Sequence, residues 1–114
     1  MEAVPLDEWW KGEIPRVDLI KMDIEGYEPT ALRGMHQTIK KTPSAKLLTE
    51  FYHDLIRKAG DDPTEFIKSL ESLGFTLSIV NELEHLVSRC AHEEIFSYCT
   101  RFLYVNLLCQ RKDG

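Results

Sequence analysis

Residues 17–29 read VDLIKMDIEGYEP, and the expected order of helices and strands is built around them. Apolar residues dominate from Val17 to Met22, as they do in a strand that is covered on both faces and needs no strict alternation. Acidic residues follow at once, beginning with Asp23, and Gly26 supplies the backbone freedom that a sharp turn needs. Pro29 suits the first position of a helix. The stretch therefore predicts a buried strand, an acidic turn and the start of a helix.

The rest of the chain continues this alternation of helices and strands. The expected elements are a helix over 29–41, a strand over 46–51, a helical turn over 54–59, a helix over 63–73 and strands over 75–80 and 102–109. Polar and apolar residues alternate in 75–80, which favours an edge position, whereas the apolar run 102–109 is typical of a central strand. Residues 81–100 show no regular pattern beyond a short helix expected over 92–98. This order of elements is typical of an α/β sheet with parallel strands.

We expect one domain with a short segment at each end. Residues 1–16 form a lead-in segment, with a short helical turn that we expect Asp7 to cap and Gly12 to end. The core is expected over 17–109, followed by a frayed tail over 110–114. Gly34 falls inside the predicted helix 29–41, where a close approach of that helix to the sheet would explain it.

The bulk composition limits the classes of function. A chain of 114 residues with 43% hydrophobic and 29% charged residues is one globular domain or part of one. Its net charge of −5 argues against a nucleic-acid partner. No apolar run approaches the roughly 20 residues of a membrane-spanning helix, and no signal peptide is visible, so we expect no membrane partner and a cytoplasmic location. Cys90, Cys99 and Cys109 are therefore expected to be reduced structural thiols.

Acidic residues gather where the first two strands end. Asp23 and Glu25 can project the same way, and a parallel sheet would bring Glu50 beside Asp23. A carboxylate there can take a proton from a hydroxyl group, so these three are the candidate catalytic residues. Tyr27 and His53 are candidates for substrate binding. The alternatives are that Asp23 caps the turn, that Glu25 and His53 are solvated, and that Tyr27 only covers the helix start.

Two further charged residues are expected to have structural roles. Glu28 is well placed to act as a helix cap or first-turn anion. Lys21 is expected to reach a carboxylate or the strand end, because burying an unpaired charge is costly. The histidines show no metal-ligand spacing, so we predict no metal site. A divalent cation held by Asp23, Glu25 and Glu50 stays open as a minor alternative.

The string DLIKMDIEGYE at 18–28, followed by ALRG at 31–34, resembles the Lys-x-Asp-x-Glu-Gly-x-Glu…Leu-x-Gly signature of FkbM-type methyltransferases. LDEWW at 6–10 also resembles that family's segment before the same strand. The resemblance covers most of the chain but only the C-terminal half of the family's domain. It implies part of a Rossmann-like class I methyltransferase fold. The sheet would be four-stranded and mixed, in the order 1-2-4-3, with the last strand antiparallel and helices on its faces.

The resemblance also implies a function, namely S-adenosylmethionine-dependent methyl transfer to the oxygen of a small-molecule hydroxyl acceptor. In the family, the glycine-rich turn and the acidic residue that bind the cofactor precede everything seen here, and the six glycines of this chain form no Gly-x-Gly. We therefore expect neither cofactor binding nor activity from this chain alone. The alternatives are a non-catalytic α/β binding or assembly module derived from that fold and, more weakly, a metal-assisted hydrolase.

The same missing half predicts a partner. Strand 17–22 would be central in the full fold, whereas here one of its edges has no neighbour. Because an open apolar edge favours pairing with another chain, we expect a homodimer through the edge of strand 17–22.

Overall fold

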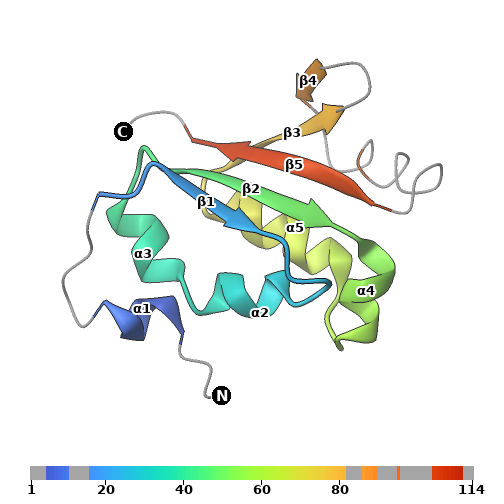
Figure 1. Cartoon of the computed structure of the whole chain (residues 1–114), viewed down its shortest axis with the longest axis horizontal. Helices are drawn as coiled ribbons and strands as arrows, with labels where there is room; N and C mark the ends of the chain where they lie inside the picture. The colour runs from blue at the N-terminus through green and yellow to red at the C-terminus, as the bar shows by residue number, and fades with distance from the viewer. Residues whose placement is uncertain (1–4, 11–15, 82–85, 90–94, 96–103, 112–114) are drawn as a thin grey trace.

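The computed structural model describes residues 5–10, 16–81, 86–89, 95 and 104–111 (Figure 1). Its elements are α1 Leu6–Trp9, β1 Leu19–Met22, α2 Glu28–Arg33, α3 His36–Lys41, β2 Lys46–Phe51, α4 His53–Lys58, α5 Pro63–Ser72, β3 Thr76–Asn81, β4 Leu86–Arg89 and β5 Val105–Gln110. Within these ranges no helix has the length and apolar character needed to cross a bilayer. The predicted α/β class is confirmed.

The strands form one mixed sheet in the order β1-β2-β5-β3-β4 (Figure 1). β1 and β2 are parallel, and β5 lies antiparallel between β2 and β3. The predicted order of the four expected strands, with the last one inserted between the second and third, is confirmed. β4 pairs with the outer edge of β3, so the prediction that strand 75–80 lies at an edge is wrong. The short helix expected over 92–98 falls, apart from Ile95, outside the described residues.

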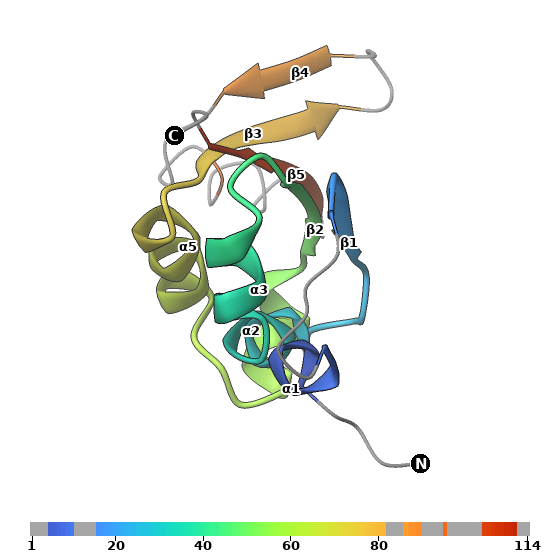
Figure 2. The ribbon, with the colours of Figure 1, turned by 90° about the vertical axis from the view of Figure 1, so that its left-hand side faces the viewer.

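The main helices α2, α3 and α5 lie on one face of the sheet (Figure 2). Along β2, Leu47, Thr49 and Phe51 are buried on this face, whereas Leu48 and Glu50 are half-buried on the other. The helix side chains that complete the core are Leu32, Ile39, Ile56, Phe66, Ile67 and Leu70. The Phe51 ring stacks on that of Phe66 at a centroid distance of 6.4 Å. This alternation leaves the opposite face of the sheet for polar groups.

One cysteine lies in the described core. Cys109 of β5 is a free, buried thiol, and burial raises its pKa to about 12. A thiol with so high a pKa is unreactive at neutral pH, because the thiolate is the nucleophilic form. The prediction of a reduced structural thiol is therefore confirmed for Cys109, whereas Cys90 and Cys99 lie outside the described residues.

β1 is shorter and more exposed than predicted. It begins at Leu19 rather than Val17, and exposure falls from 56% at Leu19 to 4% at Met22. The expectation that this strand is covered on both faces is wrong. β1 is the edge strand of the sheet, and the main described helices pack on one face (Figure 2).

The predicted helix 29–41 is two helices, because α2 ends at Gly34 and α3 begins after Met35. A Cβ atom at Gly34 would lie 3.0 Å from the Cβ of Pro5. The close approach at this glycine is therefore made by the lead-in segment and not by the sheet. Gly34 lets the start of the chain pack against the break between the two helices.

Asp7 fastens α1 to α3. Its carboxylate accepts hydrogen bonds from the backbone N–H groups of Gln37 and Thr38, at 3.0 and 2.7 Å, and from the Thr38 hydroxyl at 2.7 Å. Burial opposes ionisation, but these hydrogen bonds and nearby His36 outweigh it and hold the pKa of Asp7 below its ordinary value of 3.8. Asp7 thus caps α3, and the prediction that it caps its own helical turn is wrong.

The boundaries of α4 and α5 follow the sequence signals. Asp62 accepts a hydrogen bond from the Thr64 backbone N–H at 2.9 Å, and Pro63 takes the first helical position, as predicted. Gly60 and Gly74, with φ of 96° and 93°, follow α4 and α5. Only glycine adopts such backbone angles without strain, which explains why each helix ends there.

Arg111 ties the end of the chain to α3. Its guanidinium donates to the carbonyl oxygens of Ile39 at 2.9 Å and Thr42 at 2.6 Å. It also lies 4.6 Å from the centroid of the Phe75 ring. Since Gln110 belongs to β5, the expectation of a frayed tail from residue 110 is wrong for Gln110 and Arg111.

Candidate functional site

A hollow of about 260 Å³ lies on the sheet face opposite the main helices, near the carboxyl ends of β1 and β2. Its lining residues are Lys21, Met22, Asp23, Leu48, Glu50, Val80, Tyr104 and Asn106. β1 and β2 run parallel, and their register places Met22 beside Thr49. The next residues along the two strands, Asp23 and Glu50, therefore meet at one end of the sheet, as the sequence predicts.

Asp23 and Glu50 form a hydrogen-bonded carboxyl pair. Burial raises the pKa of Glu50 to about 7, and the hydrogen bond to Asp23 and the negative charges of Asp23, Glu28 and Glu25 contribute to this rise. The charge of Asp23 disfavours the ionised form of Glu50, because two like charges in a partly buried site repel each other. The pair can therefore take up or release a proton near neutral pH.

The turn after β1 is held in shape by Glu28. This side chain is 1% exposed, and its carboxylate accepts hydrogen bonds from the backbone N–H groups of Ile24 and Gly26, each at 2.9 Å. Glu25 has a positive φ of 54°, which is uncommon for a residue other than glycine. Glu28 lies in the first turn of α2, as predicted for a first-turn anion, but its hydrogen bonds satisfy two donors of the preceding turn and do not cap the helix.

Helix α4 packs directly on this turn at Gly26. A Cβ atom at Gly26 would lie 2.4 Å from the backbone oxygen of Leu55, and the residue has φ of 100°. Both the close approach and the backbone angle require glycine. The contact fixes the turn relative to α4, which follows β2, and so fixes Asp23 relative to Glu50.

Glu25, Tyr27 and His53, the other predicted site residues, lie outside the lining of the hollow. Glu25 is exposed but close enough for its charge to act on Glu50. Tyr27 is 58% exposed at the start of α2. His53 begins α4, and its Nδ1 lies 2.9 Å from an Asp54 carboxylate oxygen, a contact that is an ion pair only when the imidazole is protonated. Their roles stay predictions.

Sequence reasoning missed Tyr104 and Asn106. Tyr104 stacks on Tyr52 with ring centroids 5.9 Å apart, and Asn106 pairs with Glu50 in the register of β5 and β2. Asn106 is a polar residue within the apolar run 102–109, and this interruption was the available signal. Lys21 also lines the hollow near the end of β1, and within the described ranges it forms no ion pair. Of its two expected positions, beside a carboxylate or at the strand end, the structure favours the strand end.

Among the described residues, neither a glycine turn nor a group of three metal-ligand side chains borders the hollow. None of the four described glycines lines it, and the space beside Gly26 is filled by α4. Among the described residues, no three His, Cys, Asp or Glu side chains converge as metal ligands. Asp23, Glu25 and Glu50 therefore do not form the divalent-cation site that the sequence analysis kept as an alternative.

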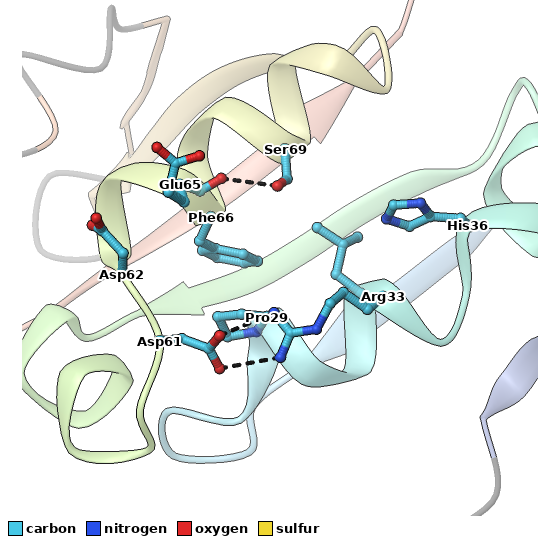
Figure 3. A pocket seen from close by; sticks show the side chains of 9 residues that line it. Pro29, Arg33, His36, Asp61, Asp62, Glu65, Phe66 and Ser69 are labelled. Atoms are coloured by element: carbon cyan, nitrogen blue, oxygen red, sulfur yellow. Dashed lines mark hydrogen bonds and ion pairs between the residues drawn. The ribbon is translucent and has the colours of Figure 1, made fainter.

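A second, smaller pocket of about 90 Å³ lies between α2 and α5 (Figure 3). The Arg33 guanidinium donates to both oxygens of Asp61 across it, at 3.0 and 3.3 Å. His36 also lines this pocket. The pocket lies away from the strand ends, and its ion pair links α2 to the segment before α5. Its charges are thus used to join two helices, and we assign it no ligand.

Comparison with known protein families gives a match over most of the chain. The model of the methyltransferase FkbM domain matches residues 1–77. No curated protein matches this chain significantly, and no solved structure does so either. The matched range contains β1, the acidic turn and β2, and therefore includes Asp23 and Glu50.

Proposed function

Because the matched range exceeds half of its length, the chain belongs to the FkbM methyltransferase family, and we propose that it forms the acceptor side of an S-adenosylmethionine-dependent O-methyltransferase. The observation that carries this proposal is the hydrogen-bonded pair of Asp23 and Glu50 in the hollow at the strand ends. Ligands of open α/β sheets bind outside the carboxyl ends of strands. We further propose a cytoplasmic location, where thiols such as Cys109 stay reduced.

The carboxyl pair suits a hydroxyl acceptor. An acceptor O–H group in the hollow can donate a hydrogen bond to the ionised carboxylate of Glu50. When the oxygen takes the methyl group and the carbon–sulfur bond of the donor breaks, the hydroxyl proton would pass to that carboxylate, which would then release it to solvent. A base is most effective when its pKa lies near the working pH, and that of Glu50 is about 7. Asn106 and Tyr104 line the same hollow and can orient the acceptor.

S-adenosylmethionine supplies the methyl group in the family. None of the described glycines borders the hollow, which supports the proposal that the described residues do not provide its site. A dinucleotide or nucleoside cofactor needs such a turn for close backbone approach. We therefore propose that these 114 residues do not bind the donor by themselves and are inactive alone.

Calorimetric titration of the folded chain with S-adenosylhomocysteine tests the donor part of the proposal. We expect no saturable heat up to about 100 μM ligand, with far-ultraviolet circular dichroism showing that the chain is folded. Saturable binding with a Kd of about 1 μM, or about −8 kcal/mol, would contradict the proposal that the donor site is missing. In that event the next assay is methyl transfer by the chain itself.

Titration of the side-chain carboxyl carbons by nuclear magnetic resonance tests the acceptor part. We expect Glu50 to titrate near pH 7, because burial and Asp23 disfavour its ionised form. Asp23→Asn should move this titration toward 4.5, the ordinary value for glutamate, since the neighbouring charge is removed. Titration of Glu50 near 4.5 in the parent protein would remove the proposed base and favour the non-catalytic binding or assembly module.

A further inference from the structure

A row of three hydrogen-bonding side chains, which we call the polar row, crosses the hollow. Asp23 directly follows β1, Glu50 lies in β2 and Asn106 lies in β5, and all three line the hollow. The registers of the strands place them side by side, because Met22 pairs with Thr49 and Glu50 pairs with Asn106. Directly opposite residues of an antiparallel pair have Cβ atoms about 4.5–5.5 Å apart. The Glu50 carboxyl and the Asn106 amide can therefore bind two neighbouring hydroxyl groups of one molecule.

Two stacked tyrosines lie one step further along the same pair of strands. The paired residues of β2 and β5 end with Phe51 beside Val105, and Tyr52 and Tyr104 come next. Tyr52 keeps an extended backbone, with φ of −120° and ψ of 90°, so its side chain returns to the face of the sheet that carries Glu50. The two tyrosine rings are nearly parallel, at 9°, with centroids 5.9 Å apart. Tyr104 lines the hollow and is 49% exposed, so an aromatic surface borders the polar row.

We propose that the acceptor is a sugar, whose pyranose ring lies on Tyr104 and whose hydroxyl groups bind the polar row. This inference rests on the proposed function and names the substrate class of the same site. A pyranose carries hydroxyl groups around its rim and C–H groups on its faces. Such a face buries apolar surface when it lies on an aromatic ring, while the rim keeps its hydrogen bonds. Residues two apart on a strand are separated by about 6.6–6.8 Å, which is similar to the width of one pyranose ring.

The hydrogen-bonding groups of the hollow favour a sugar over a phenol or a simple alcohol. Glu50 accepts hydrogen bonds when ionised, Asn106 both donates and accepts, and Lys21, which also lines the hollow, donates. A sugar presents several adjacent hydroxyl groups, each of which is a donor and an acceptor, so it can bind all of these groups together. A phenol or a simple alcohol would cover some of them without binding them, and a polar group left unpaired in this way costs affinity.

The size of the hollow and the strands that build it agree with one sugar ring. Its volume of about 260 Å³ is close to the lower end of the range of about 300–1,000 Å³ for small-molecule sites, so it suits a single ring and not a large macrocycle. Glu50 and Asn106 belong to β2 and β5, which lie inside the sheet and are paired along both edges. Their neighbours Tyr52 and Tyr104 directly adjoin these strands. The positions of all four residues are therefore set by paired strands.

Nuclear magnetic resonance titration of the folded chain with simple glycosides tests the substrate class. The probes are the methyl α-glycosides of glucopyranose, galactopyranose and mannopyranose, with catechol as the flat aromatic alternative. We expect at least one glycoside to bind saturably, with a Kd of about 1–20 mM. It should shift the side-chain amide signals of Asn106, and saturation transfer from the protein should be strongest to the C–H groups on one face of the sugar ring.

Variants of Tyr104 test its part in binding. Tyr104→Ala should weaken glycoside binding about tenfold or more, because the aromatic surface under the ring is lost. Tyr104→Phe keeps that surface, so its affinity should stay within about twofold of the parent value. Trp9→Ala is the control, since Trp9 is a 65% exposed aromatic residue of α1 that does not line the hollow. Circular dichroism shows whether each variant is folded.

The possible results separate this inference from the proposed function. If none of the three glycosides binds the folded parent chain, the proposal is overturned, and this result needs no variant. A folded Tyr104→Ala variant with undiminished affinity would overturn the position of the sugar ring. Binding of catechol without any glycoside would replace the sugar by a phenol and leave methyl transfer to oxygen standing. The proposed function fails separately, when Glu50 titrates near 4.5 in the parent protein, whether or not a glycoside binds.

Discussion

Replacing Gly26 by alanine is expected to destabilise the protein by about 3 kcal/mol or more. A Cβ atom at this position lies 2.4 Å from the Leu55 carbonyl oxygen and needs φ of 100°. The backbone angle alone costs an L-residue roughly 1–2 kcal/mol, and forcing atoms into a packed contact costs typically 1–3 kcal/mol more. Urea denaturation of the parent and of Gly26→Ala, followed by circular dichroism, measures the difference.

Gly60→Ala is the matched control for this prediction. Gly60 has nearly the same backbone angle, with φ of 96°, but no atom lies within 4 Å of the position that a Cβ atom would take there. Only the backbone strain applies at this residue, so we expect a loss of roughly 1–2 kcal/mol. If the two substitutions destabilise the protein equally, the contact between the turn and α4 does not constrain the turn. A smaller loss for Gly26→Ala than for Gly60→Ala would contradict the packing of α4 on this turn.

The sequence predicts the parts of the fold that local chemistry decides. Pro63 and Asp62 start α5, and Gly60 and Gly74 stop helices, because caps and positive φ angles involve neighbouring residues only. The partner of Asp7 was not predictable in this way, since α3 lies 30 residues further along the chain. β4 was missed for a similar reason, because only its pairing with β3 makes that short segment a strand.

The residues of the candidate site also differ in whether the sequence could predict them. Asp23 and Glu50 follow apolar strands, and parallel neighbours bring such ends together, so their meeting was predictable from the two strands alone. Asn106 and Tyr104 enter the hollow from the antiparallel β5 and the residue before it, whose register depends on the whole sheet. The exposure of β1 was mispredicted because an apolar run looks the same in an edge strand and in a central one.

Glu50→Gln is expected to stabilise the protein at pH 8 by about 1–2 kcal/mol. A carboxyl whose pKa rises from 4.5 to about 7 on folding favours the unfolded chain by up to about 3 kcal/mol above pH 7, and partial exposure reduces this value. Below pH 4.5 Glu50 is protonated in both the folded and the unfolded chain, so it costs no stability. As the pH rises from 4.5 through 7, the unfolded chain releases its proton first, so the stability of the parent protein should fall.

Glutamine at position 50 resembles the protonated glutamic acid at every pH, so the free energy of unfolding of Glu50→Gln should lack this decline between pH 4.5 and 7. Chemical denaturation at four or five pH values compares the two profiles. Glu65→Gln is the control, since the Glu65 side chain is 69% exposed and its removal should leave the profile unchanged. Parallel profiles for the parent and Glu50→Gln would show that folding does not raise the pKa of Glu50. A gain in stability would instead mark Glu50 as a residue kept at a cost to folding, as active-site carboxylates often are.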